Sequence, residues 1–527
     1  MSNFSSEFSM KQKNWIFVLS LKVGKASSWC RCSIAISAGI LSACALPPLH
    51  LIPMLFISFP CLIWLVDGAS SCRRAFLDGW WFGLGHFLAG LYWITFSLTI
   101  DQNFFWLIPF SLLGIPAVIA IYIACATAFL RFARKGFVRI ALFAASWVFF
   151  EWLRGILFTG FPWNGIGLVW ANSESAIQIV SYIGLIGLGF LTVFWASSLA
   201  ALAYEKSFFS FAKFIPFVIC LSVVLIPGYV RLAITEKSGF HKDIYLRIVQ
   251  PNIPQSIKWS KSHRMKHLSS LLELSRRPSA APIIITVWPE TASPFVVSLS
   301  KAYRKVLGGV MSENGFLLTG SIRLRTDGIQ NLQIWNSLHA ISSKGRVIMT
   351  YDKHHLVPFG EFVPFSGFLR KHLGIKKITT GRTDFSAGNG PKSFILPKIP
   401  SFSPSICYEV IFSNKVAYLR DRPKWFLNIT NDAWFGNSSG PYQHLAMARM
   451  RAVEQGIPLV RAANTGISAI VDPFGHIMKF IPLEKKGVID FYLPKPIEGG
   501  TVYSRIGDWP ILVFIFIMGV YLVLRFR

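Results

Sequence analysis

Cys407 is the side chain with the clearest potential for chemistry. The chain contains eight cysteines, and the other seven lie in or beside long apolar runs of the N-terminal half. Cys407 stands alone in the polar half, which therefore offers it neither a disulfide partner nor a second thiol for a zinc site. A short β-type run, Ser405-Ile406, precedes it and is typical of a thiol presented at a strand end. The alternative is a buried cysteine that packs as a small hydrophobic residue.

Two other polar side chains also follow predicted strands directly. Residues 283–288 predict a buried strand that leads into Glu290, and residues 346–352 predict a strand that leads into Lys353. A sheet can bring such strand ends to one rim. There, Glu290 would take the thiol proton, Lys353 would stabilise the thiolate and the oxyanion, and Cys407 would attack a carbonyl. Taken singly, each residue also has an ordinary reading as a surface acid, a solvated charge or a core thiol.

Histidine is the usual base beside a catalytic cysteine. His354, His355 and His444 are therefore further candidates for that role. Their spacing does not suggest a metal site, so we expect neither a metal nor another cofactor.

Composition indicates a membrane protein. Of 527 residues, 53% are hydrophobic and 15% are charged, which is too apolar for an ordinary soluble protein. Eight apolar runs are candidates for spanning a bilayer, and they lie near 33–47, 50–66, 77–99, 104–130, 138–158, 174–203, 209–232 and 508–525.

The net charge of +28 argues for membrane orientation rather than for nucleic-acid binding, because the basic residues gather in alternate short loops. This positive-inside pattern predicts that both termini are cytoplasmic. Four regions follow: a basic cytoplasmic extension (1–32), a seven-span bundle (33–232), an extracytoplasmic domain (233–507) and a C-terminal span (508–527).

The domain at 233–507 has the composition of a globular α/β fold. Strands are predicted near 245–250, 283–288, 315–323, 334–342, 346–352, 401–407, 425–430, 459–464, 467–472 and 488–492, and helices near 260–274 and 442–455.

Glu151 and Arg154 are charged residues within the apolar region, three positions apart on one predicted helix face. They predict either a structural ion pair or a polar, lipid-accessible cleft. A second ambiguous stretch follows Glu361, where apolar residues including Phe365 and Phe368 either pack on the domain or form a lid that dips into lipid.

Several sequence blocks resemble those of a known family. Trp288-Pro289-Glu290, Tyr351-Asp352-Lys353 and Ile406-Cys407-Tyr408-Glu409 resemble the Glu-Lys-Cys motifs of the nitrilase, or carbon–nitrogen hydrolase, superfamily. Further blocks resemble signature segments of its membrane-embedded branch, the apolipoprotein N-acyltransferases, and they lie at 151–155, 159–163, 249–259, 355–364 and 430–436. The similarity covers nearly the whole chain from about residue 33.

The resemblance implies an α-β-β-α sandwich joined to an eight-helix bundle, with its catalytic domain on the periplasmic side of a bacterial inner membrane. It implies transfer of an acyl chain from a phospholipid to a cysteine thioester, and then to the α-amine of a diacylated apolipoprotein. It also implies residue roles: Glu290 as base, Lys353 as oxyanion partner, Cys407 as nucleophile, Glu361, Tyr408 and Glu409 as supporting residues, and Trp259, Asn336 and Trp434 as substrate-binding residues.

Two rival functions use the same domain. A membrane-anchored amidase or nitrilase would give its acyl group to water, and a non-catalytic scaffold would need no reactive residues. The presence of Glu290, Lys353 and Cys407 together argues against the scaffold. We expect a monomer.

Overall fold

The computed structural model describes residues 15–204, 215–235, 239–327, 331–373, 377–379, 383–416 and 421–525. The chain forms two compact units. The helical unit comprises Met1–Tyr92, Leu107–Thr235 and Val502–Arg527, and the sandwich unit comprises Trp93–Trp106 and Glu236–Thr501. Each unit is described by itself.

The sandwich unit contains two six-stranded sheets. The first has the order β12-β1-β2-β3-β4-β5 and the second β11-β10-β9-β8-β7-β6. The strands are β1 (Phe240–Gln250), β2 (Ile283–Val287), β3 (Phe316–Asp327), β4 (Asn331–Ser342), β5 (Val347–Asp352), β6 (Phe394–Leu396), β7 (Ile399–Ile406), β8 (Trp425–Thr430), β9 (Leu459–Ala463), β10 (Ser468–Val471), β11 (Ile477–Ile481) and β12 (Gly487–Pro494).

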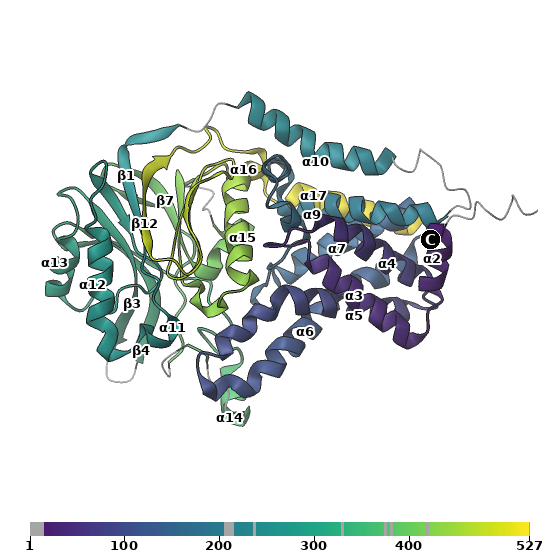
Figure 1. Ribbon diagram of the computed structural model, residues 1–527, viewed down its shortest axis with the longest axis horizontal. Helices are drawn as coiled ribbons and strands as arrows, with labels where there is room; N and C mark the ends of the chain where they lie inside the picture. The colour runs from purple at the N-terminus through teal and green to yellow at the C-terminus, as the bar shows by residue number, and fades with distance from the viewer. Residues whose placement is uncertain are drawn as a thin grey trace, which may run out of the picture. The chain divides into compact units, whose positions relative to one another are not determined.

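Apolar side chains from both sheets form one buried core between them. Ile248 and Val287 of the first sheet belong to the same cluster as Leu427 and Val460 of the second. A second cluster covers the outer face of the first sheet, where α12 (Arg264–Ser275) and α13 (Lys301–Gly308) pack. Helix α15 (Ser439–Gln455) covers the second sheet, which completes an α-β-β-α sandwich (Figure 1).

The predicted strands are confirmed, including the consecutive antiparallel trio β3, β4 and β5. Two strands were missed, β6 and β11. Strand β6 has only three residues, and most of β11 is exposed or half-buried. Both close the edge of a sheet and are held by a neighbouring strand, so their own sequences carry little alternating signal.

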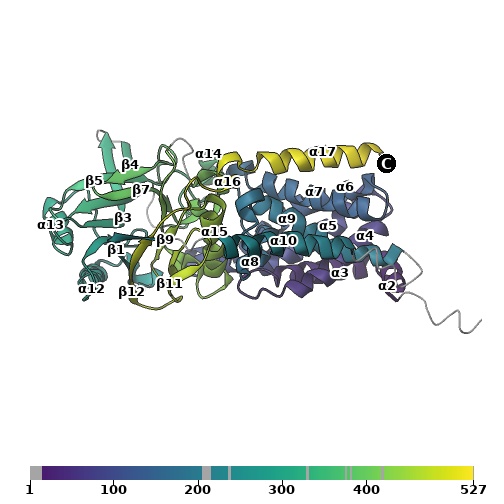
Figure 2. The same cartoon turned by 90° about the horizontal axis from the view of Figure 1, so that it is seen from above.

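The helical unit is built from α2 (Trp15–Gly24), α3 (Ser28–Ala43), α4 (Leu55–Asp67), α5 (Cys72–Leu91), α6 (Ile115–Phe129), α7 (Phe137–Arg154), α8 (Glu174–Ile177), α9 (Val180–Ser198), α10 (Ile215–Ile234), α16 (Val502–Ile506) and α17 (Trp509–Arg525). Its long helices, among them α9, α10 and α17, run alongside one another (Figure 2). Helices α2 and α3 occupy most of the described part of the predicted 1–32 extension.

Among the described helices, three are long and apolar enough to cross a membrane: Phe110–Phe132, Val180–Tyr204 and Ile215–Ile234. The predicted number of eight spans is therefore not confirmed by length and composition. Helices α3 and α4 have 16 and 13 residues, and α7 carries Arg139, Glu151 and Arg154. Short length and internal charge both weaken a membrane-span signal.

Buried charges in the helical unit are paired or hydrogen-bonded. Arg31 forms an ion pair with Asp78. Glu151 accepts hydrogen bonds from the backbone N–H of Ile166 (3.1 Å) and the Trp147 indole (3.3 Å). Such contacts reduce the cost of placing charges in an apolar bundle.

The segment Trp93–Trp106 differs from the prediction, which placed residues 93–99 and 104–106 in membrane spans of the bundle at 33–232. Helix α5 ends at Leu91, and the residues that follow form 3₁₀ turns that belong to the sandwich unit. The Trp93 indole N–H donates to Gln443 Oε1 (3.0 Å), and its ring lies 4.5 Å from that of Phe435. Specific aromatic packing thus replaces a further helical turn.

Candidate active site

Three strand ends carry the predicted triad. Glu290 follows β2 and Lys353 follows β5 in the first sheet, whereas Cys407 follows β7 in the second. All three are buried, with 6%, 1% and 8% of each residue exposed. The acid and the amine therefore come from one sheet and the thiol from the other.

Lys353 is placed between two carboxylates. Its Nζ lies 2.9 Å from Glu361 Oε2 and 3.8 Å from Glu290 Oε1. The Asn336 amide donates to Glu290 Oε1 (2.7 Å) and to Glu361 Oε1 (3.2 Å), so it holds both acids in place. The structure thus brings together four of the predicted residues, which are Glu290, Asn336, Lys353 and Glu361. Asn336, predicted to bind substrate, is hydrogen-bonded to both carboxylates instead.

The turn that carries Glu290 packs directly against β3. A Cβ atom on Gly320 would lie 2.4 Å from the Thr291 backbone nitrogen and 2.7 Å from Glu290 Cα. Those distances are shorter than any van der Waals contact, so a glycine at 320 is needed for the two segments to approach. The second carboxylate oxygen of Glu290, Oε2, has no hydrogen-bond partner among the described residues. It is free to accept a proton.

Cys407 has a left-handed backbone conformation, with φ of 53°. That conformation costs roughly 1–2 kcal/mol for a residue other than glycine, so surrounding contacts must hold it. The Glu409 carboxylate supplies them, because it accepts the N–H groups of Ile406 (2.7 Å) and His354 (2.7 Å). It also accepts the Tyr351 hydroxyl (2.9 Å).

Glu409 therefore ties the end of β5, which carries Lys353, to the end of β7, which carries Cys407. Burial alone would raise the pKa of Glu409, but its hydrogen bonds to His354 and Ile406 hold that pKa below its ordinary value. Glu409 stays ionised and acts as a clamp between the two sheets. Its neighbour Tyr408 is buried, with its ring 5.8 Å from that of His355.

The histidines hold other groups rather than the thiol sulfur. His444 Nε2 lies 3.2 Å from the backbone carbonyl oxygen of Cys407, and its Nδ1 lies 2.9 Å from Asp432. His354 Nδ1 lies 2.7 Å from Glu409, and His355 Nδ1 lies 3.4 Å from the Lys415 ammonium. These contacts favour structural roles for the three histidines and leave Glu290 as the base candidate.

Sequence reasoning missed a buried charge network beneath Cys407. The Asp432 carboxylate accepts hydrogen bonds from Arg461 (2.8 Å) and from the Thr430 hydroxyl (2.9 Å), in addition to its contact with His444. Asp432, His444 and Arg461 are at most 1% exposed. The available signal was Arg461 itself, a charged residue inside the otherwise apolar strand β9.

Asp432→Asn is expected to destabilise the sandwich unit by about 3–5 kcal/mol, because Arg461 would lose its buried counter-charge. Burial alone would raise the pKa of Asp432, but Arg461 and His444 lower it to about 2. The ionised Asp432 therefore adds to the free energy of unfolding above its unfolded-state pKa of about 3.9, and this stabilisation is lost as pH falls toward 2. Thermal unfolding of the full chain measures the effect. Asp243→Asn, at an exposed site, is the matched control, and equal melting temperatures for the two variants would contradict the prediction.

Burial and the charges around the triad together favour the neutral thiol form of Cys407. Burial raises the pKa of Cys407 to about 12, Glu290 adds to the rise and Lys353 opposes it. Burial also raises the pKa of Glu290. Burial alone would lower the pKa of Lys353, but Glu361 and Glu290 outweigh that effect and raise it. Lys353 is therefore a cation at neutral pH, and the buried Cys407 side chain favours its neutral thiol form.

The two predicted substrate-binding tryptophans, Trp259 and Trp434, are half-buried. Each lies close in sequence to a residue that contacts the candidate site. Trp259 follows Lys258, whose Nζ donates to the backbone carbonyl oxygen of Glu290 (3.1 Å). Trp434 lies in the 3₁₀ turn Asp432–Phe435, next to the network beneath Cys407. Among the described residues, no group of three or more His, Cys, Asp or Glu side chains is arranged to hold a metal ion.

In the loop after Glu361, one predicted apolar residue packs on the domain, whereas others are exposed, as expected for a lid. Val363 is 3% exposed and packs inside, whereas Phe365 and Phe368, at the start of α14 (Ser366–Leu373), are 81% and 62% exposed. This loop therefore presents aromatic side chains to its surroundings.

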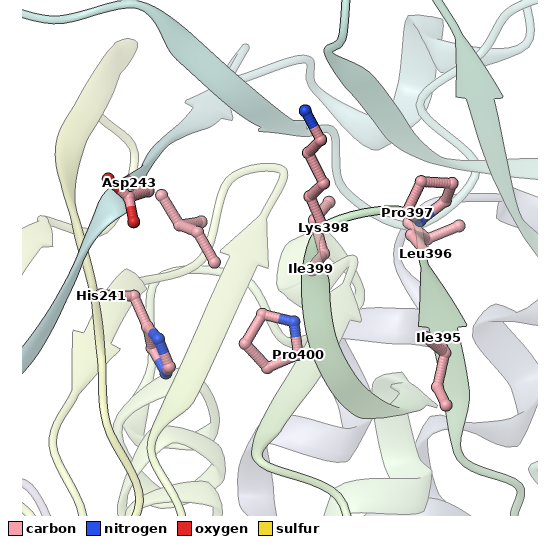
Figure 3. A pocket seen from close by; sticks show the side chains of 9 residues that line it. His241, Asp243, Ile395, Leu396, Pro397, Lys398, Ile399 and Pro400 are labelled. Carbon is pink, nitrogen blue, oxygen red and sulfur yellow. The ribbon is translucent and has the colours of Figure 1, made fainter.

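A cavity of about 590 Å³ lies elsewhere in the sandwich unit. Figure 3 shows His241 and Asp243 of β1 on one side and the β6–β7 turn, with Lys398, on the other. None of the predicted site residues lines it, so it is distinct from the candidate active site.

Comparisons with known proteins identify relatives over most of the chain. A family model described as the apolipoprotein N-acyltransferase N-terminal domain matches residues 38–199, and one described as carbon-nitrogen hydrolase matches residues 246–494. An apolipoprotein N-acyltransferase of Rhodopseudomonas palustris is 38% identical over 519 residues, which cover 95% of this chain and 96% of the relative. One of Rickettsia prowazekii is 35% identical over 484 residues, covering 92% and 96%.

A solved structure of a Nesterenkonia AN1 amidase from the nitrilase superfamily covers 52% of this chain and 97% of its own, with 17% identity and a TM-score of 0.37.

Proposed function

The chain belongs to the apolipoprotein N-acyltransferase family and is an enzyme that N-acylates lipoproteins, and from this premise we propose that Glu290, Lys353 and Cys407 carry out the transfer. The observation that carries the proposal is the unpartnered Oε2 of the buried Glu290, in a site that also holds a cation and a thiol. Phospholipid is the acyl donor, and the diacylated apolipoprotein is the acceptor.

In the first half-reaction, Glu290 Oε2 takes the proton of the Cys407 thiol as the sulfur attacks the ester carbonyl of the phospholipid. Lys353 stabilises the negative charge that develops on the carbonyl oxygen. The carbon–oxygen ester bond then breaks, and Glu290 returns its proton to the departing oxygen. The products are a thioester on Cys407 and a lysophospholipid.

In the second half-reaction, the free α-amine of the acceptor attacks the thioester carbonyl. Glu290 accepts a proton from the attacking nitrogen, Lys353 again stabilises the oxyanion, and the carbon–sulfur bond breaks. The departing thiolate receives the proton from Glu290, so the enzyme returns to its starting state with an amide formed on the lipoprotein. Glu361 and Asn336 hold Lys353 and Glu290 during both steps.

We further propose that the enzyme lies in a bacterial inner membrane as a monomer, with eight spans, both termini in the cytoplasm and the sandwich unit on the periplasmic side. The alternation of basic loops supports this orientation. The exposed Phe365 and Phe368 support contact of the sandwich unit with lipid. To test the orientation, a reporter enzyme that works only in the periplasm is fused after Arg527. We expect no reporter activity, and clear activity would contradict the proposed cytoplasmic C-terminus.

Purified enzyme supplied with phospholipid vesicles and a diacylated lipopeptide is expected to release one lysophospholipid for each triacylated lipopeptide formed. Both products are quantified by mass spectrometry. With vesicles alone, we expect a single turnover that stops at the acyl-enzyme. Without an amine acceptor, and with water excluded from the site, the thioester is not cleaved. Continued release of free fatty acid without lipopeptide would instead identify a hydrolase and would contradict the proposal.

A further inference from the structure

Lys258 is a buried lysine that has no role in the steps above. It is the last residue of α11 (Gln255–Lys258) and is only 5% exposed. Its Nζ donates a hydrogen bond to the backbone carbonyl oxygen of Glu290, at 3.1 Å. A neutral donor would satisfy that oxygen equally well, and a buried ammonium is costly unless opposite charge lies nearby. The position therefore calls for an explanation that involves charge.

The neighbours of Lys258 provide the opposite charge. It interacts electrostatically with Glu290, and also with Cys407 whenever that residue is a thiolate. Glu290 in turn faces Lys353 and Glu361. Without Lys258, two carboxylates would share one ammonium group, and the buried site would carry a net negative charge. With Lys258, the two acids and the two ammonium groups balance while the thiol is neutral.

We infer that Lys258 is a positioning residue of the acyl-transfer reaction, which acts through Glu290 by fixing its backbone and by keeping its side chain in the carboxylate form that accepts a proton. The inference rests on the function proposed above for Glu290 and Cys407.

The balance of forces on Glu290 supports this role. Burial raises the pKa of Glu290, Lys353 opposes that rise, Glu361 adds to it, and Lys258 opposes it. Burial also lowers the pKa of Lys258 to about 8, which still leaves it charged at neutral pH. A protonated Glu290 cannot take the proton of the Cys407 thiol. Losing the charge of Lys258 would therefore leave fewer enzyme molecules with a working base.

Two substitutions separate charge from hydrogen bonding. Lys258→Gln keeps a donor without the charge, whereas Lys258→Arg keeps the charge. The rate of lysophospholipid release in the first turnover is measured against pH, with the full chain in phospholipid-containing micelles. Removal of a nearby cation raises the pKa of Glu290, so in Lys258→Gln the acidic limb of the profile is expected to move up by about one pH unit. On that limb the rate falls about tenfold. In Lys258→Arg, the acidic limb is expected to stay at its wild-type position.

If the acidic limb of the pH–rate profile does not move in Lys258→Gln, the inference is overturned, whether the rate is normal or reduced at every pH. Lys258 would then have a structural role at most. If Lys258→Gln does not fold, as judged by gel filtration, then Lys258→Arg still decides, because an upward shift of its acidic limb would also overturn the inference. Glu290→Gln and Cys407→Ala are run in the same assay. If either is active, the proposed site itself is wrong. If both are inactive and the limb of Lys258→Gln is unmoved, only the inference about Lys258 fails.

Discussion

Cys407→Ala is expected to form no acyl-enzyme and to release no lysophospholipid above background, while the protein still folds and enters the membrane. In the proposed mechanism the Cys407 sulfur forms the covalent bond, and the alanine side chain has no nucleophilic atom. The substitution removes a single sulfur atom from a site held by Glu409 and by the network beneath it, so little stability is lost. Mass spectrometry of the intact protein after incubation with phospholipid shows the acyl adduct in the wild type and its absence in the variant.

The matched control is Cys72→Ala, at an exposed cysteine of the helical unit. This variant is expected to keep both the adduct and the wild-type rate of lipopeptide acylation. Should Cys407→Ala still carry an acyl group, or should it acylate the lipopeptide at the wild-type rate, the thioester mechanism would be abandoned. Peptide mapping of the wild-type adduct to any other cysteine would have the same consequence.

Lys353→Met is expected to reduce the rate of acyl-enzyme formation by at least about 10²–10³-fold, the usual effect of losing one oxyanion-stabilising group. It is also expected to destabilise the protein by about 3–5 kcal/mol, because Glu290 and Glu361 would be left buried without their shared cation. Methionine preserves the apolar volume of the lysine side chain, so the comparison isolates the charge. Single-turnover kinetics and thermal unfolding of the same preparation measure both effects.

Lys344→Met is the control for this substitution, since Lys344 is exposed in the turn between β4 and β5. It is expected to change neither the rate nor the melting temperature. A Lys353→Met enzyme with a near-normal rate would show that another group stabilises the oxyanion. If instead the rate falls while the melting temperature stays unchanged, Lys353 would act in catalysis without the structural role that its two carboxylates predict.

The candidate reactive residues could be predicted because each directly follows a predicted strand. Strands such as β2 and β7 are buried and have a clear pattern, so Glu290 and Cys407 stood out as polar residues at their ends. The sequence also contained Lys353, which ends the predicted hairpin strand β5. Local pattern and residue type made these residues candidates, and the resemblance of their sequence blocks to the nitrilase superfamily supplied their proposed roles.

Other features depended on contacts between distant segments. The contact of His444 with the Cys407 carbonyl joins residues 37 positions apart. The clamp made by Glu409 spans 58 positions to Tyr351. The segment Trp93–Trp106 belongs to the sandwich unit, and Trp93 in it forms a hydrogen bond with Gln443, 350 positions away. Periodicity within a short window carries no information about such partners, so the histidines were open candidates for the base and this segment was assigned to membrane spans.

The sequence by itself therefore determined the class of the protein and most strands of the sandwich, and it supplied the candidates for the reactive residues, because each of these follows from local hydrophobic pattern and side-chain chemistry. Only the tertiary structure decided how these residues are used. It placed Lys353 between two acids, left one oxygen of Glu290 without a partner, and buried Lys258 against the Glu290 backbone. The physical reason is that protonation and charge depend on burial and on neighbours, and folding alone determines which neighbours a buried group receives.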